Sequence, residues 1–403
     1  MPAYRYAGIP VCRRRAIQVM ALILATTGVT RRRAAAQGNA LPVRGADISF
    51  TLQEESIGTT YSVGGAVAPI EKILADAGAN FVRLRVWVDP PEGYSDLASA
   101  LNLARRAKVA GLKIFLDLNY SDFWTDPRNQ WTPRAWTMLD PEALQQTVLD
   151  YTRSVLAAFQ AQGTPVDMVQ VGNEVTYGML WPTGEIYGTG GENWAPFCTL
   201  LSAGIAGVRD SEPAGRALPV VIHIFGENGD ARYFYDHILE EGVDDFDVIG
   251  LTHFPWWTGS LASLQANLDD LGDRYRKPLL IAETAYPWAV PDEGWFQYKG
   301  AWFQNKGVWL QNKGDWFQNI SQLPDGSLFP PTPNGQLAYF QALRGLLEQL
   351  PDGRGLGFFA WEPGWLPGVP DEPGGGNPFV DLTMFDNRGE ALPALTEAFR
   401  PPP

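Results

Sequence analysis

Two glutamates stand at the ends of short apolar segments that lie far apart in the sequence. Glu174 closes the segment MVQVGNE (168–174), and Glu283 closes LLIAE (279–283). A retaining glycosidase needs two carboxyl groups about 5–5.5 Å apart, one to attack the anomeric carbon and one to protonate the leaving oxygen and then activate water. We interpret Glu174 as the candidate general acid/base and Glu283 as the candidate nucleophile.

Asn173 directly precedes Glu174. Its amide can bond a substrate 2-hydroxyl, a contact that strengthens in the transition state of this reaction. The alternative is that the Asn-Glu dipeptide only caps a helix after the strand. The second glutamate, at the end of another strand, favours the catalytic interpretation.

Charged side chains at other strand ends are candidates for tuning the two carboxyls. Arg85 ends an apolar segment, and we expect it, rather than Arg83, to keep Glu283 ionised through a charge-assisted hydrogen bond. A structural ion pair beneath the site is the alternative. Glu362 also stands at a strand end, but we interpret it as a partner of site residues and not as one of the catalytic pair.

Aromatic and polar residues complete the candidate substrate-binding set. Trp361 could form the floor of a sugar subsite, with packing in the core as the alternative. His253 and Trp257 are expected to contact sugar or to position the nucleophile. The remaining candidates for substrate binding are Asp47, Trp87 and Asn119.

The elements that must position these residues alternate between short apolar runs and amphipathic helices. Near-continuous apolar runs are typical of parallel strands buried on both faces. Eight such alternations predict an α/β fold, a single (β/α)8 TIM barrel with long βα loops over residues 45–400. The predicted strands are Gly45–Phe50, Asn80–Trp87, Leu112–Leu118, Val166–Val171, Pro219–Ile224, Phe246–Leu251, Pro278–Ala282 and Gly355–Trp361.

Most of the candidate residues stand at or just after the carboxyl end of a predicted strand. In a (β/α)8 barrel these ends and the loops that follow them form the active-site face. The fourth and seventh strands carry the two glutamates, and they lie across a barrel roughly wide enough to hold a sugar ring. This clustering is a stronger indication of a site than any single residue.

The composition favours a neutral substrate. The formal net charge is -14, and residues 1–36 contain seven Arg and no Asp or Glu, so the rest of the chain carries about -21. An acidic body repels phosphate backbones, which makes nucleic acid a poor partner. The 15 Trp, 14 Tyr and 20 Phe offer aromatic faces for sugar rings, although they also fill cores.

Residues 1–36 resemble an export signal peptide. Arg13 to Arg15 are basic, Ala16 to Val29 is too short and interrupted to span a membrane stably, and Ala34 to Ala36 offers a cleavage site. We expect a secreted or periplasmic protein with no membrane attachment after processing; an uncleaved anchor is the alternative. Cleavage would remove Cys12 and leave Cys198 alone, so neither a disulfide nor a zinc site is expected.

A Trp-rich repeat occupies residues 294–320, after the seventh predicted strand. Its units are GWFQYKG, AWFQNKG, VWLQNKG and DWFQNI. The Asn-Lys-Gly ends are more typical of turns than of a coiled coil. Three interpretations stay open: a duplicated segment in a tolerant loop, an aromatic platform for polysaccharide, and a contact with another protein.

Seven motifs together resemble glycoside hydrolase family 53, the arabinogalactan endo-β-1,4-galactanases. The resemblance implies a barrel with Glu174 as acid/base on strand four and Glu283 as nucleophile on strand seven. It further implies a retaining, endo-acting enzyme on β-1,4-galactan or type I arabinogalactan, and we expect a monomer. The alternatives are a related endo-glycanase on another β-linked polysaccharide and a non-catalytic carbohydrate-binding protein. The motifs are GADIS (45–49), FVRLRVWVDP (81–90), YSDFWTDP (120–127), VQVGNEVTYGMLWPTG (169–184), GLTHFPWW (250–257), AETAYPW (282–288) and WEPGW (361–365).

The sequence departs from the family pattern at three places. Asn119 stands where relatives usually have His, and His253-Phe254 stands where they usually have paired tyrosines. Both changes border the predicted site, so the activity class is a safer prediction than the sugar. Bacterial relatives often bind calcium after strand seven, where this chain has the Trp repeat and no dense acidic cluster. We therefore predict no cofactor. A further group in the Gly-rich eighth loop is interpreted as solvated, with binding of a cation as the alternative: Asp371, Glu372, Asn377 and Asp381.

Overall fold

The computed structural model describes residues 40–213, 215–226, 230–289, 323–371, 373–377 and 379–400. They belong to one compact unit, Asn39–Pro403. The predicted signal peptide (1–36) and the Trp-rich repeat (294–320) lie outside the described residues, so the expectations for them stay predictions. Within the described part of the chain, no helix has the length and apolar character needed to cross a membrane.

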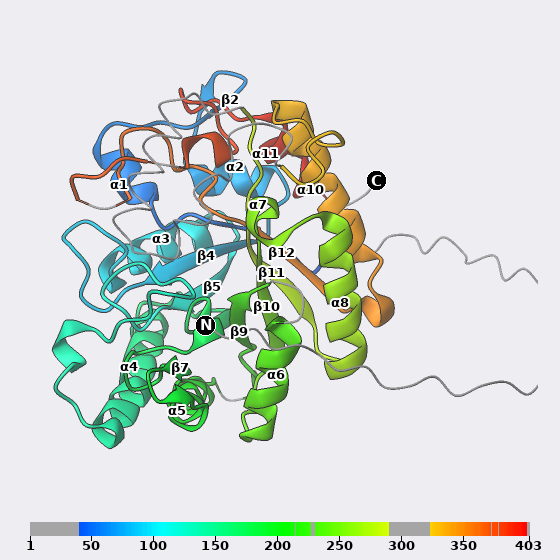
Figure 1. The fold of residues 1–403 in the computed structure, drawn as a ribbon. Coiled ribbons are helices and arrows are strands. Elements are labelled where there is room, and N and C mark those ends of the chain that lie inside the picture. Colours follow the sequence, from blue (N-terminus) through cyan, green and yellow to red (C-terminus); the bar gives the residue numbers. More distant parts are fainter. Residues whose placement is uncertain are drawn as a thin grey trace, which may run out of the picture. The chain divides into compact units, whose positions relative to one another are not determined.

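Eight parallel strands close into a barrel, which confirms the predicted fold (Figure 1). Neighbours in the barrel follow chain order, and the last strand pairs with the first. Each predicted strand is present to within a few residues; the first ends earlier than expected, so Ile48 to Phe50 lie in the loop after it. The strands are β1 (Val43–Asp47), β4 (Phe81–Val86), β5 (Lys113–Leu118), β6 (Met168–Val171), β9 (Val220–Phe225), β10 (Val248–His253), β11 (Leu279–Thr284) and β12 (Gly355–Ala360).

Helices pack around the barrel with their apolar faces inward. In α4, Leu144, Val148 and Val155 are buried at helical spacing, and Asp140 caps the first turn by accepting from Ala143 N at 2.9 Å. The helices are α1 (Thr51–Ser56), α2 (Ile70–Asp76), α3 (Leu97–Val109), α4 (Pro141–Ala161), α5 (Ala195–Asp210), α6 (Asp230–Glu240), α7 (Pro255–Thr258), α8 (Leu261–Tyr275), α10 (Pro333–Glu348) and α11 (Pro393–Glu397).

The connections between these helices and strands contain short hairpins and 3₁₀ turns. The two-stranded hairpins are β2 (Ser62–Val63) with β3 (Ala66–Val67), and β7 (Tyr187–Gly188) with β8 (Gly191–Glu192). The 3₁₀ turns are η1 (Arg134–Trp136), η2 (Val175–Tyr177), η5 (Pro351–Gly353) and η6 (Val380–Leu382).

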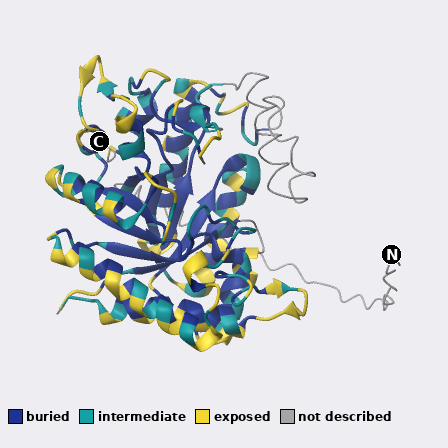
Figure 2. Ribbon diagram, turned by 90° about the vertical axis from the view of Figure 1, so that its left-hand side faces the viewer, coloured by how far each residue is buried: buried dark blue, intermediate teal, exposed yellow. Residues whose placement is uncertain are grey.

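The barrel interior changes from apolar to polar along the strands. Figure 2 shows the strands as the buried centre of the molecule and exposed residues on the outer faces of the helices. An apolar layer includes Phe81, Phe115 and Met168. Because alternate residues of a strand point the same way, the next inward positions on β4, β5 and β6 are Arg83, Asp117 and Gln170. A buried polar layer therefore lies directly toward the carboxyl ends of the strands.

One carboxyl in α1 makes stability depend on pH. Glu54 is buried, accepts from Thr59 Oγ1 at 2.8 Å, and has its pKa raised by burial from 4.5 to about 7. Its protonated form therefore stabilises the fold fully below pH 4.5, and this contribution is lost as the pH rises through 7. When the pH is raised from 4.5 to 8, we expect the free energy of unfolding of Glu54→Gln to rise by roughly 3 kcal/mol relative to that of the wild type. Urea unfolding at both pH values measures the gain, and an equal difference at both would contradict it.

Candidate active site

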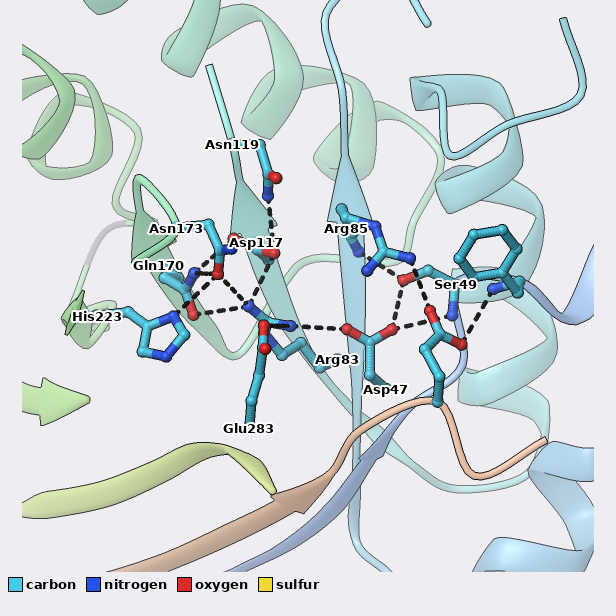
Figure 3. A network of polar contacts seen from close by, with 12 residues as sticks. Asp47, Ser49, Arg83, Arg85, Asp117, Asn119, Gln170, Asn173, His223 and Glu283 are labelled. Carbon is cyan, nitrogen blue, oxygen red and sulfur yellow. Dashed lines mark hydrogen bonds and ion pairs between the residues drawn. The ribbon is translucent and has the colours of Figure 1, made fainter. Parts of the chain in front are cut away.

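Arg83 is the centre of the polar layer, as Figure 3 shows. Its guanidinium contacts three carboxylates: Asp47 at 2.8 Å, Asp117 at 2.9 Å and Glu283 at 2.8 Å. Its Nη2 also donates to Asn173 Oδ1 at 2.9 Å. All of these side chains are buried. One cation therefore compensates three buried carboxylates and helps to orient the amide beside Glu174.

The prediction that Arg85 pairs with Glu283 is wrong, because Arg83 makes that contact. Arg85 Nη2 lies 2.7 Å from Glu362 Oε1, and its guanidinium carbon lies 4.4 Å from the ring centroid of Trp124. Arg83 and Arg85 share one face of β4, but Arg85 is one step nearer the carboxyl end of the strand. It therefore reaches the loop after β12, while Arg83 stays among the strands. Arg85 still lines the cavity described below.

Glu174 and Glu283 line the same cavity, which has a volume of about 710 Å³. Glu174 lies in the connection just after β6, the fourth strand of the barrel, and Glu283 lies near the carboxyl end of β11, the seventh. Glu174 has φ 50°, in the left-handed region, and follows Gly172 with φ 77°. A Cβ at position 172 would lie 2.5 Å from Val175 Cγ1. The turn thus requires glycine, and it stores backbone strain at the acidic residue, as is common at functional sites.

The two carboxyls have different electrostatic surroundings. Burial raises the pKa of Glu283 to about 7, and the adjacent Arg83 opposes this rise. Burial and then the charge of Glu283 raise the pKa of Glu174 well above its usual value. Within the described residues Glu174 bonds Thr252 Oγ1 and contacts no cation. When two coupled carboxyls share one proton, the neighbouring cation favours the charge on Glu283 and leaves the proton to Glu174.

Aromatic side chains form much of the cavity wall. Six of the ten predicted site residues line it: Arg85, Asn173, Glu174, Trp257, Glu283 and Trp361. Residues 121–129, which include most of the YSDFWTDP motif, supply a continuous stretch of the wall. Trp124 lies in this motif but was not predicted as a site residue.

Other lining residues come from loops far apart in the sequence. Trp131 is 61% exposed, while Phe225, Phe254 and Phe379 also face the cavity. The position of Trp131 shortly after a quoted motif was a usable signal. No sequence pattern marks Phe379, because only the closed barrel brings its loop beside Trp361, with ring centroids 4.9 Å apart.

The other four predicted binding residues lie behind the cavity wall, so we revise their expected role from substrate contact to positioning. Asp47 is bound by Arg83. Asn119 Oδ1 accepts from Trp87 Nε1 at 3.1 Å, and its amide nitrogen donates to Asp117 at 2.8 Å. His253 follows the inward-pointing Thr252 on β10, so its ring points outward. Its Nδ1 lies 2.7 Å from Thr258 Oγ1, and its ring stacks on Tyr339 of α10.

The interpretation of the acidic group in the eighth βα loop as solvated is wrong for two of its members, because Asp371 is 1% and Asp381 9% exposed. Asn377 Oδ1 accepts from Phe379 N at 2.9 Å, and its amide nitrogen donates to Trp365 and Leu366 carbonyls, both at 3.0 Å. Over the described residues, no three His, Cys, Asp or Glu side chains gather closely enough to hold a metal. Glu372 and residues 290–322 of the loop after β11 lie outside the described residues.

A (β/α)8 barrel with two buried carboxyl groups at its fourth and seventh strands, facing an aromatic-walled cavity, defines the class of glycoside hydrolases. The model of glycosyl hydrolase family 53 matches residues 43–398. The chain belongs to this family.

Relatives and solved structures agree with this assignment. The chain is 38% identical to an uncharacterized protein encoded in the bgaB 5' region of Niallia circulans, over 88% of this chain and 92% of that one. It is 35% identical to an arabinogalactan endo-β-1,4-galactanase of Cellvibrio japonicus, over 87% of this chain and 89% of that one. A solved fungal β-1,4-galactanase superposes with a TM-score of 0.75 at 30% identity, covering 89% of this chain and 99% of the other.

Proposed function

We propose that this chain is a retaining endo-β-1,4-galactanase, with Glu174 as acid/base and Glu283 as nucleophile. The observation that carries the roles is the contrast between the two carboxyls. Arg83 lies 2.8 Å from Glu283, whereas Glu174 has a hydroxyl partner. The names of the Cellvibrio and fungal relatives support galactan as the substrate.

The mechanism follows from these surroundings. Glu283 attacks the anomeric carbon while Glu174 gives its proton to the glycosidic oxygen, which leaves with the departing chain. The ionised Glu174 then takes a proton from water, and the resulting attack releases Glu283. The amide of Asn173 donates one N–H to Thr125 O at 3.1 Å, and we expect its second N–H to bond the substrate 2-hydroxyl.

A polysaccharide panel tests the substrate. We expect oligosaccharides from β-1,4-galactan and none from mannan, xylan or β-glucan. Internal cleavage should lower the viscosity of galactan much faster than it releases reducing ends. Products from another polymer and none from galactan would replace this proposal with the related endo-glycanase.

An azide experiment tests the acid/base role. Glu174→Ala should lose activity on galactan by about 10³-fold, the order that acid–base catalysis contributes. It should keep activity on an aryl galactobioside with a highly acidic leaving group, which departs without protonation. Azide should then accelerate turnover and yield the β-glycosyl azide, because a small anion can occupy the vacated space. Glu174→Gln, which fills that space, is the matched control and should show little acceleration.

We also propose a secreted or periplasmic monomer without a bound metal. The N-terminal pattern at residues 1–36 supports export, and sequencing the exported protein should locate a new N-terminus near Gln37. The acid–base mechanism requires no metal, so activity should survive dialysis against EDTA. Light scattering should give the monomer mass; a dimer mass, or activity restored only by Ca²⁺, would contradict the respective statement.

A further inference from the structure

A chain of buried side chains connects Glu174 to the interior of the barrel. Thr252 Oγ1, on β10, bonds Glu174 Oε1 and lies 2.9 Å from His223 Nε2. His223 Nδ1, on β9, lies 2.9 Å from Asn173 Oδ1. His223 and Thr252 have 0% exposure. The hydrogens of this hydrogen-bond network can be assigned one by one from Asn173, because the neighbours of its amide fix that end.

Asn173 determines which nitrogen of His223 carries hydrogen. The amide oxygen of Asn173 accepts from Arg83 Nη2 at 2.9 Å and from Gln170 Nε2 at 3.0 Å. Its amide nitrogen donates to a carbonyl, so the amide orientation is settled by its neighbours. An amide oxygen cannot donate, and therefore Nδ1 of His223 must. Figure 3 shows this end of the chain, with His223 beside Asn173.

His223 is a neutral ring with one acceptor nitrogen. Burial, and secondarily the charge of Arg83, lower its pKa well below the usual value. With hydrogen on Nδ1, the Nε2 atom offers only a lone pair. Nε2 faces the Thr252 hydroxyl, which has one hydrogen and two possible acceptors.

The Thr252 hydrogen must follow the protonation state of Glu174. If Glu174 is ionised, the hydroxyl donates to the carboxylate, and His223 Nε2 is left buried without a donor. If Glu174 carries the proton, Glu174 donates to Thr252, and Thr252 donates to His223. Only in the second state does every polar atom of the network from Glu174 to Asn173 have a hydrogen-bond partner. A buried acceptor without a donor costs free energy, so the network favours the proton-bearing state.

We propose that Thr252 and His223 are positioning residues that favour the proton-bearing form of Glu174, with the Thr252 hydroxyl turning between Glu174 and His223 at each proton transfer. In the resting state the proton lies on Oε1, the oxygen that bonds Thr252, and a carboxyl carries only one proton. The carboxyl must therefore turn to present this proton to the leaving oxygen, and once the proton is given the Thr252 hydroxyl donates to the new carboxylate. When that carboxylate takes a proton from water, the hydroxyl turns back to His223. This inference rests on the proposed acid/base role of Glu174.

The pH profile of kcat/KM provides a test that simple loss of packing would not imitate. His223→Phe removes the acceptor, so the Thr252 hydrogen is always available to the carboxylate. The basic limb, which reports ionisation of Glu174, should move to lower pH by about one unit, the scale of one unsatisfied buried group. In a Thr252→Val background the same His223→Phe change should not move the limb, because the hydroxyl that transmits it is absent. Thr252→Ser should keep the wild-type profile.

Two outcomes would overturn the inference: an unmoved basic limb in folded His223→Phe, and an equal shift with and without the Thr252 hydroxyl. If His223→Phe does not fold, ¹⁵N NMR of histidine-labelled wild-type enzyme decides instead, since the chain has 3 His. A neutral His223 with hydrogen on Nδ1 is expected across the active pH range, and hydrogen on Nε2 would overturn it. If the Glu174→Ala azide experiment fails, the proposed function fails, whereas a wrong His223 result alone leaves that function standing.

Discussion

Glu283→Gln should reduce kcat on galactan by about 10⁶-fold, the order of loss when a covalent nucleophile is removed from a hydrolase. The amide keeps the shape of the side chain and can still accept from Arg83 through its oxygen. It cannot form the glycosyl-enzyme intermediate, because a neutral amide is a poor nucleophile. Steady-state rates at saturating galactan measure the loss, and thermal unfolding checks that the variant folds.

Glu362→Gln is the matched control for this change. Glu362 is also a buried glutamate next to an arginine, with Arg85 Nη2 at 2.7 Å. It does not line the cavity. We expect its replacement to change kcat by less than about tenfold, because it positions Arg85 and does not touch the reacting atoms. A comparable loss of kcat in the two variants, or a kcat of Glu283→Gln within tenfold of the wild-type value, would contradict the assignment of Glu283 as nucleophile.

Arg83→Met should lower the free energy of unfolding by roughly 3–5 kcal/mol, the scale of an uncompensated buried charge. Asp47, Asp117 and Glu283 all lie within 2.9 Å of this guanidinium and would lose it together. Adding Asp117→Asn should recover part of the loss, because one of the unpaired charges is then removed. Urea unfolding of the single and double variants measures both effects, and an additive further loss in the double variant would contradict this explanation.

The same substitution should change the pH dependence of the reaction. Burial raises the pKa of Glu283 and Arg83 lowers it, and the net result of all its surroundings is a pKa of about 7. Without Arg83 the pKa rises further, so the acid limb of kcat/KM moves to higher pH, because the nucleophile must be ionised. Arg85→Met is the matched control and should move this limb far less, since Arg85 contacts Glu362. Arg83→Lys, which keeps the charge but not the fork of donors, should shift the limb less than Arg83→Met. Equal shifts in the Arg83→Met and Arg85→Met variants would show that Arg83 has no special role.

The fold was predictable because its parallel strands are buried on both faces. Such strands appear in the sequence as apolar runs, and the helices between them repeat apolar residues at three and four positions. The placement of the two glutamates at one cavity was predictable for a related reason. Two glutamates that close strands four and seven must emerge at the same face of a barrel, whatever the details of packing.

Depth within the barrel was not predictable in the same way. Arg83 and Arg85 are the same residue type and point to the same face of β4, so the local sequence does not show which of them contacts Glu283. His253 and Asp47 both stand at strand ends. The His253 ring nevertheless turns outward to Tyr339, whereas the Asp47 carboxylate pairs with Arg83 inside the barrel. These outcomes depend on the stagger of neighbouring strands and on loops contributed by distant segments.

The sequence by itself determined the barrel, the face that carries the site and the positions of the two glutamates. The apolar runs and the order of the strands along the chain can both be read from the sequence, and a barrel places the carboxyl ends of all its strands on one face. Only the tertiary structure showed which carboxyl lies beside a cation and which beside a hydroxyl. Arg83 contacts Glu283, whereas Thr252, backed by His223, contacts Glu174. Burial makes these contacts decisive, because a charge or acceptor removed from water must find its partner within a few ångströms.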